Sequence, residues 1–133
     1  MEIVINAAYG GYGLSWEAMK ALAERKGFKL YIYAYDWHNT YRKVDSPKRG
    51  LDVFYSNKDL GSETDSVPPE CYCSDNDFER NDPDLVAVVR ELGDKANGLF
   101  AKLKIVKIPD DVDWEITEYD GYERVEEKHR SWG

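Results

Sequence analysis

One segment constrains the fold more than any other part of this sequence: a glycine-rich loop between a β-branched run and a helix with both ends marked. The run 2–8 (EIVINAA) favours a short strand, and the glycines of 10–13 interrupt any regular element. Ser15 stands where an N-cap would, and 16–26 has apolar residues at helical spacing before Gly27 ends it. The sequence therefore predicts a strand, a tight loop and a helix in succession.

A second strand is predicted directly after that helix. Residues 29–37 (KLYIYAYDW) alternate aromatic and aliphatic side chains. If the two strands are parallel neighbours, the connection is right-handed and the glycine loop opens at the carboxyl end of the first strand. Open α/β sheets bind their ligands at that edge.

The middle of the chain carries little periodicity. Between residues 38 and 79 only 52–55 (DVFY) resembles a strand, and the rest is rich in Ser, Asp, Asn, Pro and Gly. We expect a long central loop, which either carries function or is solvent-exposed padding.

The carboxyl half regains regular patterns. Asp82 and Pro83 are typical of a helix start, and strands are expected within 99–108 and 113–119. The turn signal Asp120-Gly121 leads either to a hairpin partner or to a helix over 123–128, and the preference of Glu and Lys for helices favours the helix.

These elements predict an α/β fold, with an α+β arrangement as the alternative. The 133 residues, of which 42% are hydrophobic, suffice for a single compact domain over 1–133. We expect a small mixed sheet of about four strands, two main helices and the central loop.

The net charge of -8 limits the partners. Such a field repels the phosphate backbone of bulk nucleic acid and anionic membrane surfaces. A small anion held by backbone N–H groups and a few Arg remains allowed, because distant charges are screened within roughly 8 Å. An acidic surface that docks on a host protein is equally allowed.

Other features of the sequence narrow the class further. Cys71 and Cys73 are too close for an unstrained disulfide and lack companions for zinc, so we expect free loop thiols. With no run of about 20 apolar residues, we expect a protein of the host cytoplasm without a membrane anchor. His38 and His129 belong to no catalytic or metal-binding motif, and we therefore expect no catalytic residues, no metal and no cofactor.

The glycine loop is the best local candidate for a binding site. Glycines allow close approach by a ligand, and a helix that starts after them points free N–H groups at an anion. Tyr9 and Tyr12 could stack on a nucleobase, and Arg80 precedes a second helix start. The alternatives are a tight turn without ligand, core tyrosines and a surface Arg80.

The two ends of the chain resemble a widespread family of phage and prophage proteins of unassigned activity. The family motif I-N-x-x-Y-G-G-[FY]-G-L-S is matched by Ile5, Asn6, Tyr9, Gly10, Gly11, Tyr12, Gly13, Leu14 and Ser15. R-x-D-P is matched by Arg80, Asp82 and Pro83, and A-x-L-K-I-V-x-I-P-D by 101–110. W-E-I-x-E-Y-D-G is matched by 114–121, and E-x-H-R-x-W by Glu127, His129, Arg130 and Trp132. Ala7 and Ala8 depart from the family, which often has a polar residue or Cys there.

The resemblance implies a phage protein that blunts host defence, in the manner of an anti-CBASS nucleotide sponge. Such a protein sequesters a cyclic nucleotide signal, with a cyclic dinucleotide favoured, and can be a homo-oligomer. A protein-interaction module and a small nucleotide hydrolase are the alternatives. The predicted ligand-binding residues are Asn6, Tyr9, Gly10, Gly11, Tyr12, Gly13, Ser15, Arg80, Asp82 and Arg130.

Overall fold

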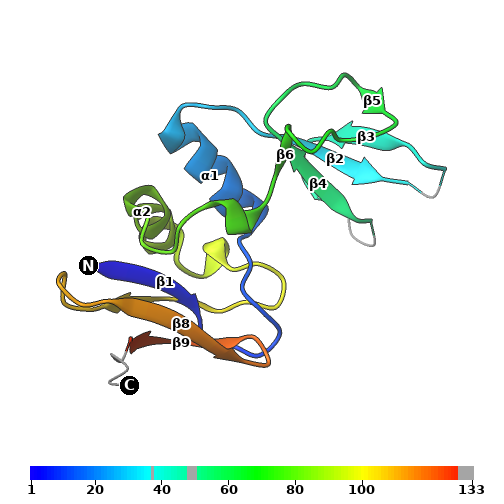
Figure 1. Ribbon diagram of the computed structural model, residues 1–133. Coiled ribbons are helices and arrows are strands. Elements are labelled where there is room, and N and C mark those ends of the chain that lie inside the picture. Colours follow the sequence, from blue (N-terminus) through cyan, green and yellow to red (C-terminus); the bar gives the residue numbers. More distant parts are fainter. Residues whose placement is uncertain (37, 48–50, 129–133) are drawn as a thin grey trace. The chain divides into compact units, whose positions relative to one another are not determined.

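The computed structural model describes residues 1–36, 38–47 and 51–128, and its chain forms two compact units (Figure 1). Unit 1 is built from Met1–Ala18 and Phe78–Gly133, and unit 2 from Met19–Asp77. Helices and strands are mixed along the chain, which confirms the predicted α/β class.

Unit 1 contains a two-stranded antiparallel sheet. It pairs β1 (Glu2–Asn6) with β7 (Leu103–Lys107), so that Val4 lies opposite Ile105. The middle of β1 is fully buried, as its β-branched residues predicted. Both strands lie within segments for which the sequence predicts strands.

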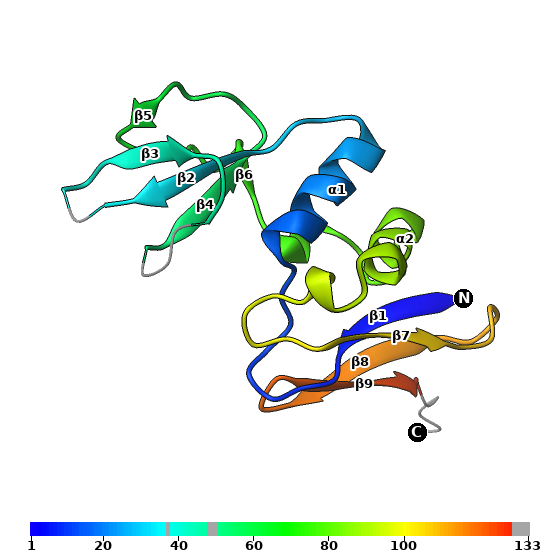
Figure 2. The ribbon, with the colours of Figure 1, turned by 180° about the vertical axis from the view of Figure 1, so that it is seen from behind.

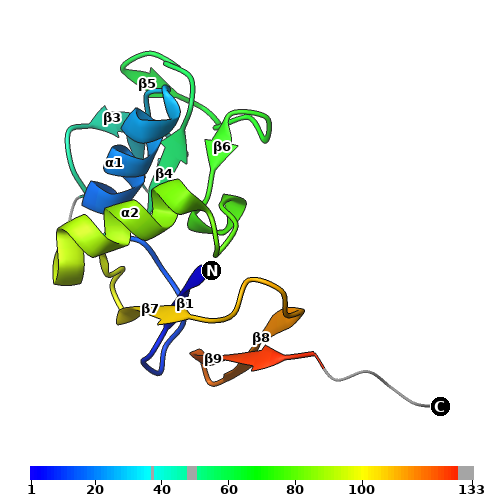
Figure 3. The ribbon, with the colours of Figure 1, turned by 90° about the vertical axis from the view of Figure 1, so that its left-hand side faces the viewer.

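α2 (Pro83–Leu92) and the hairpin of β8 (Trp114–Tyr119) and β9 (Tyr122–Glu127) lie on opposite sides of the β1–β7 pair (Figure 3). The side chain of Asp82 accepts a hydrogen bond from the amide of Asp84 at 2.8 Å and so caps α2, as predicted. The buried stripe of α2 consists of Leu85, Val86, Val88 and Val89. A short 3-10 turn, η2 (Gly93–Ala96), follows it.

The hairpin corrects one prediction. Residues 123–128 do not form a helix, because β9 (Tyr122–Glu127) pairs with β8 (Trp114–Tyr119). Asp120 and Gly121 both have positive φ, 49° and 86°, which is the geometry of a two-residue hairpin turn. Helix propensity amounts to tenths of a kcal/mol per residue, and the turn with its cross-strand pairs outweighs it.

α1 (Trp16–Lys26) forms where the sequence predicts a helix. The hydroxyl of Ser15 accepts a hydrogen bond from the amide of Ala18 at 3.1 Å, which confirms Ser15 as the N-cap. The residues of α1 that are fully buried are Ala18, Met19, Leu22 and Ala23.

Unit 2 contains a five-stranded antiparallel sheet (Figure 2). Its order is β5 (Glu63–Thr64), β3 (Tyr41–Val44), β2 (Tyr31–Tyr35), β4 (Val53–Ser56) and β6 (Tyr72–Cys73), and η1 (Asp75–Asp77) follows β6. The buried hydroxyl of Tyr33 donates to the carbonyl of Gly61 at 2.8 Å and accepts from the amide of Leu60 at 2.9 Å. The described part of the central region 38–79 therefore contains four short strands joined by loops, whereas the sequence predicts one long loop with a strand only at 52–55.

The strands of the described residues lie in three antiparallel sheets rather than in one mixed sheet. β2 pairs with β3 and β4, and the partner of β1 is β7. The parallel arrangement that would have opened the glycine loop at a shared sheet edge is consequently absent from the described strands.

Two further expectations concern membranes and cysteines. Within the described residues, neither α-helix combines the length and the apolar character needed to cross a bilayer. Cys71 and Cys73 are both free, and both are buried in unit 2. Burial, with the neighbouring charge of Asp77, raises the pKa of the Cys73 thiol.

Candidate ligand-binding groove

The glycine loop packs directly against the turn of the β8–β9 hairpin. The amide of Gly10 donates to the carbonyl of Asp120 at 3.0 Å. A Cβ atom added to Gly121 would lie 2.7 Å from the Cα of Gly11, well inside van der Waals contact. Glycines are therefore required here because two backbones touch, which is a structural reason independent of any ligand.

The far end of the loop is held by the segment after η2. Gly98 donates its amide to the carbonyl of Gly13 at 2.9 Å, and a Cβ on Gly98 would lie 2.7 Å from the carbonyl carbon of Gly13. Ser15 donates its amide to the carbonyl of Ala96 at 2.9 Å and its hydroxyl to the carbonyl of Lys95 at 2.5 Å. The loop amides of Gly10 and Ser15 thus already have protein acceptors.

Arg80 lies at the centre of a charged network in unit 1. Its guanidinium forms two hydrogen bonds with the carboxylate of Glu123, at 2.7 and 2.9 Å, and a third with the carbonyl of Val4 at 3.2 Å. The guanidinium also stacks on the ring of Tyr12, 3.4 Å from its centroid. Only 18% of the Arg80 side chain and 9% of the Glu123 side chain are exposed, so this is a mostly buried ion pair.

Asn6 extends the same network and is completely buried. Its backbone amide donates to the Glu123 carboxylate at 2.7 Å, and its side-chain amide donates to the carbonyls of Ala8 and Gly121 at 2.8 and 2.7 Å. Its side-chain oxygen accepts from the amide of Lys102 at 2.9 Å. Asn6 therefore joins β1, the hairpin turn and the chain leading into β7.

The network supplies hydrogen-bond partners to the edge of β1 that faces away from β7. The amide of Val4 donates to the carbonyl of Arg80 at 2.8 Å, and the amide of Asn6 is bonded to Glu123. Edge N–H and C=O groups otherwise need a neighbouring strand or water. Arg80 and Glu123 thus supply the partners of a missing strand.

The predicted ligand-binding residues therefore fall into separate places. Asn6, Tyr12 and Arg80 come together in the network, whereas Asp82 caps α2 and Ser15 caps α1. Arg130 lies outside the described residues. Tyr9 lies on a different surface, beside Tyr122 of β9.

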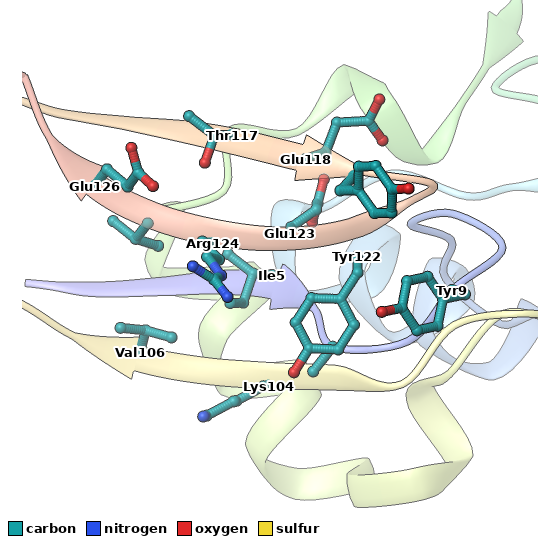
Figure 4. Close-up of a pocket in the computed structure, with 13 residues that line it drawn as sticks. Ile5, Tyr9, Lys104, Val106, Thr117, Glu118, Tyr122, Glu123, Arg124 and Glu126 are labelled. Atoms are coloured by element: carbon teal, nitrogen blue, oxygen red, sulfur yellow. The ribbon is translucent and has the colours of Figure 1, made fainter.

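That surface is an open groove of about 790 Å³ over β1, β7, β8 and β9 of unit 1 (Figure 4). Its lining consists of Ile5, Ala7, Tyr9, Lys104, Val106, Thr117, Glu118, Tyr119, Tyr122, Glu123, Arg124, Val125 and Glu126. Its volume falls in the range of known small-molecule sites.

Two cations and two aromatic rings lie on one face of the groove (Figure 4). Lys104 comes from β7 and Arg124 from β9, both are exposed, and neither forms an ion pair with any described residue. The rings of Tyr9 and Tyr122 are 5.5 Å apart at their centroids and inclined by 47°. The carboxylates of Glu118, Glu123 and Glu126 also line the groove.

Sequence reasoning missed most of this groove for one reason. Side chains of a strand alternate between its faces, so Tyr122, Arg124 and Glu126 share one face of β9. On the predicted helix over 123–128, Arg124 and Glu126 would instead point about 200° apart, following a 3.6-residue period. The signal that could have found them is the Asp120-Gly121 turn, which indicates a hairpin.

Neither histidine is among the described residues that line the groove. His38 is exposed in the turn between β2 and β3 of unit 2, where its amide donates to Asp36 at 2.9 Å. His129 lies outside the described residues. Within the described ranges, no group of three or more His, Cys, Asp or Glu side chains is arranged to hold a metal ion.

Comparison with known proteins adds no relative: no protein family, curated protein or solved structure matches this chain.

Proposed function

We propose that this protein binds a small nucleotide in the groove of unit 1 and holds it without chemical change. The observation that carries the proposal is the pairing of two cations free of ion pairs, Lys104 and Arg124, with the adjacent rings of Tyr9 and Tyr122. Phosphates need positive donors and a nucleobase needs an aromatic face. The groove offers both on one surface.

The division of roles follows from the chemistry of the side chains. Tyr9 and Tyr122 take the base, because stacking on an aromatic ring contributes roughly 1–3 kcal/mol per base. Arg124 and Lys104 take the phosphates, for which the forked guanidinium is the better partner. Thr117 supplies the aliphatic hydroxyl of the lining, which is suited to a ribose or phosphate oxygen.

Storage rather than turnover is favoured by the composition of the lining. Nucleophilic catalysis needs a nucleophile beside a base that a third group orients. Among the described residues, the lining contains no His, Cys or Ser, so its aliphatic hydroxyl Thr117 has no histidine base beside it. Of its three carboxylates, Glu123 is bonded to Arg80, Glu118 accepts a hydrogen bond from the amide of Gly121 at 3.1 Å, and Glu126 is the third.

The ligand class is a cyclic nucleotide, with a cyclic dinucleotide favoured, and its sequestration would inhibit host anti-phage defence. This part of the proposal is supported by the resemblance of both chain ends to phage proteins. An open groove of about 790 Å³ is also large enough for two nucleotide units rather than one.

The test is calorimetric titration with a panel of cyclic dinucleotides and cyclic trinucleotides, followed by recovery of the ligand after denaturation. Lys104→Ala and Arg124→Ala should each weaken binding about tenfold, because each removes one charge-assisted contact. Lys107→Ala is the matched control, since Lys107 also lies on β7 but does not line the groove. Recovery of a chemically altered ligand would show that the protein hydrolyses the nucleotide instead of storing it.

A second candidate function, a protein-interaction module, rests on the distribution of charge. The segments of unit 1 carry 16 acidic and 9 basic residues, a net charge of -7 out of -8 for the chain. Such a field steers basic partners and speeds their association. Failure of every nucleotide to bind, together with loss of activity on neutralising Glu115 and Glu118, would favour this alternative.

A further inference from the structure

Two stretches of unit 1 lack charged side chains altogether. Residues 3–16 and 96–101 contain no Asp, Glu, Lys or Arg, although 33% of the chain is charged. The first contains β1 apart from Glu2, together with the glycine loop, and the second lies between η2 and β7. Loops of a strongly charged protein are ordinarily its most polar parts, so the absence of charge from these two stretches needs an explanation.

The two uncharged stretches meet at one place. A Cβ on Gly10 would lie 2.8 Å from the Cβ of Phe100, and Gly98 is bonded to Gly13. An isolated β-bridge joins Leu14 to Asn97. We call the surface formed by residues 9–11 and 98–101 the uncharged tip.

The uncharged tip exposes large apolar side chains. Leu99 is 91% exposed, Phe100 66% and Tyr9 67%. The hairpin turn borders the tip through the bond between Gly10 and Asp120, and it adds Tyr119, which is 73% exposed. Contiguous exposed apolar residues of this kind mark interaction sites, whereas single ones need no explanation.

The backbone of the tip is attached to neighbouring segments at two points. Gly10 is bonded to Asp120, and the backbone of Gly98 lies against that of Gly13. A preorganised surface loses little conformational entropy on binding. The exposed side chains are therefore carried by a backbone with two attachments to its neighbours, which favours docking.

We propose that the uncharged tip is a self-association surface that docks on the tip of a second copy of this chain. Two acidic units repel each other over most surfaces, but the tip places no like charges in contact. Lys102 follows the tip in sequence and Asp120 adjoins it, so a two-fold arrangement can set opposite charges at the rim. An apolar centre with a polar rim is the usual pattern of protein interfaces.

The exposed area predicts a weak dimer. At roughly 200 Å² per aromatic side chain, the exposed parts of Tyr9, Phe100 and Tyr119 amount to about 400 Å². Leu99 adds about 150 Å², and the total stays below the ~800 Å² per partner of a standard interface. We therefore expect dissociation in the range of about 10–100 µM.

Sedimentation velocity of the full chain between about 5 and 500 µM tests the proposal. The weight-average mass should rise toward twice the monomer mass, and the double variant Leu99→Ser, Phe100→Ser should remain monomeric throughout. Leu51→Ser is the matched control, because Leu51 is an exposed leucine of unit 2 and should leave dimerisation unchanged. Circular dichroism checks that the double variant is folded, which its high exposure favours.

Two results would overturn the proposal: a wild-type chain that stays monomeric over the whole range, or dimers that survive in the double variant. A further experiment is co-sedimentation with phosphatidylcholine vesicles. If the chain stays monomeric but binds these vesicles, the tip docks on a lipid surface and not on a second copy. The test does not depend on nucleotide binding, because the substituted residues Leu99 and Phe100 do not line the groove, although Tyr9 and Tyr119 belong to both surfaces.

Discussion

Replacing Arg80 by Ala distinguishes a structural role for this residue from a direct role in holding an anion. The substitution leaves the Glu123 carboxylate, 9% exposed, without its cation. It also removes the guanidinium from the carbonyl of Val4 and from the ring of Tyr12. The substitution therefore removes contacts at the edge of β1 and at the glycine loop.

The magnitude follows from burial. Removing one partner of a buried ion pair costs about 3–5 kcal/mol, because the remaining charge is left uncompensated. The Arg80 side chain is 18% exposed, which admits some water, so we expect the low end, about 3 kcal/mol. At about 4 °C per kcal/mol for a chain of this size, the melting temperature should fall by about 12 °C.

Chemical denaturation gives the free energy, and hydrogen exchange locates the effect. The amide of Asn6, which donates to Glu123, should exchange markedly faster in the variant. Arg90→Ala is the matched control, because the Arg90–Glu2 pair on the surface has side chains 56% and 36% exposed and should contribute at most ~1 kcal/mol.

The reasoning fails if Arg80→Ala is within about 0.5 kcal/mol of the wild type, a change typical of surface substitutions. A variant of normal stability that has lost nucleotide binding would instead support Arg80 as the anion partner that the sequence predicts.

Three further outcomes are expected. Gly121→Ala should destabilise the protein by more than about 1 kcal/mol in urea denaturation, because its φ is 86° and its Cβ would overlap Gly11; a neutral effect would contradict that contact. Cys73 should react slowly with thiol reagents at pH 8, because burial raises the pKa of its thiol, and labelling as fast as in the unfolded chain would refute this. Asp36 should titrate below its usual pKa of 3.8 in NMR, because hydrogen bonding to Arg42 lowers that pKa; any stability it contributes is present above 3.8 and is lost as the pH falls through the lowered value.

Local signals in the sequence were enough for the two α-helices and for β1, β2, β4, β7 and β8. Ser15 and the pair Asp82-Pro83 are capping residues whose effect is confined to one turn, so they predict helix starts without knowledge of the fold. The β-branched start of β1 works in the same way. The α/β class follows from these elements alone.

The pairing of strands could not be predicted, because it depends on residues far apart in the chain. β1 finds its partner about a hundred residues later, and the unit 2 strands β5 and β6 have two residues each, too few for any periodic pattern. β9 was predicted as a helix because its Glu-rich composition favours a helix in isolation. Because β9 was not predicted as a strand, the sequence could not show that Tyr122 and Arg124 lie on one face.

The candidate site was predicted in part. The sequence places Tyr9 at a binding surface, and Tyr9 lines the groove. It also points to Arg80 as the cation, but nothing in the sequence indicates that Glu123 lies beside it. Lys104 and Arg124 belong to charged stretches that are ordinarily solvated faces, and only the hairpin brings them onto one surface.

The most direct test of the central claim is calorimetric titration of a cyclic dinucleotide panel into the wild type and into the double variant Lys104→Ala, Arg124→Ala. We predict that at least one member binds the wild type, is recovered intact, and loses about a hundredfold in affinity for the double variant. Equal affinity for both proteins, or no binding to the wild type, would contradict the assignment of the groove as a nucleotide site.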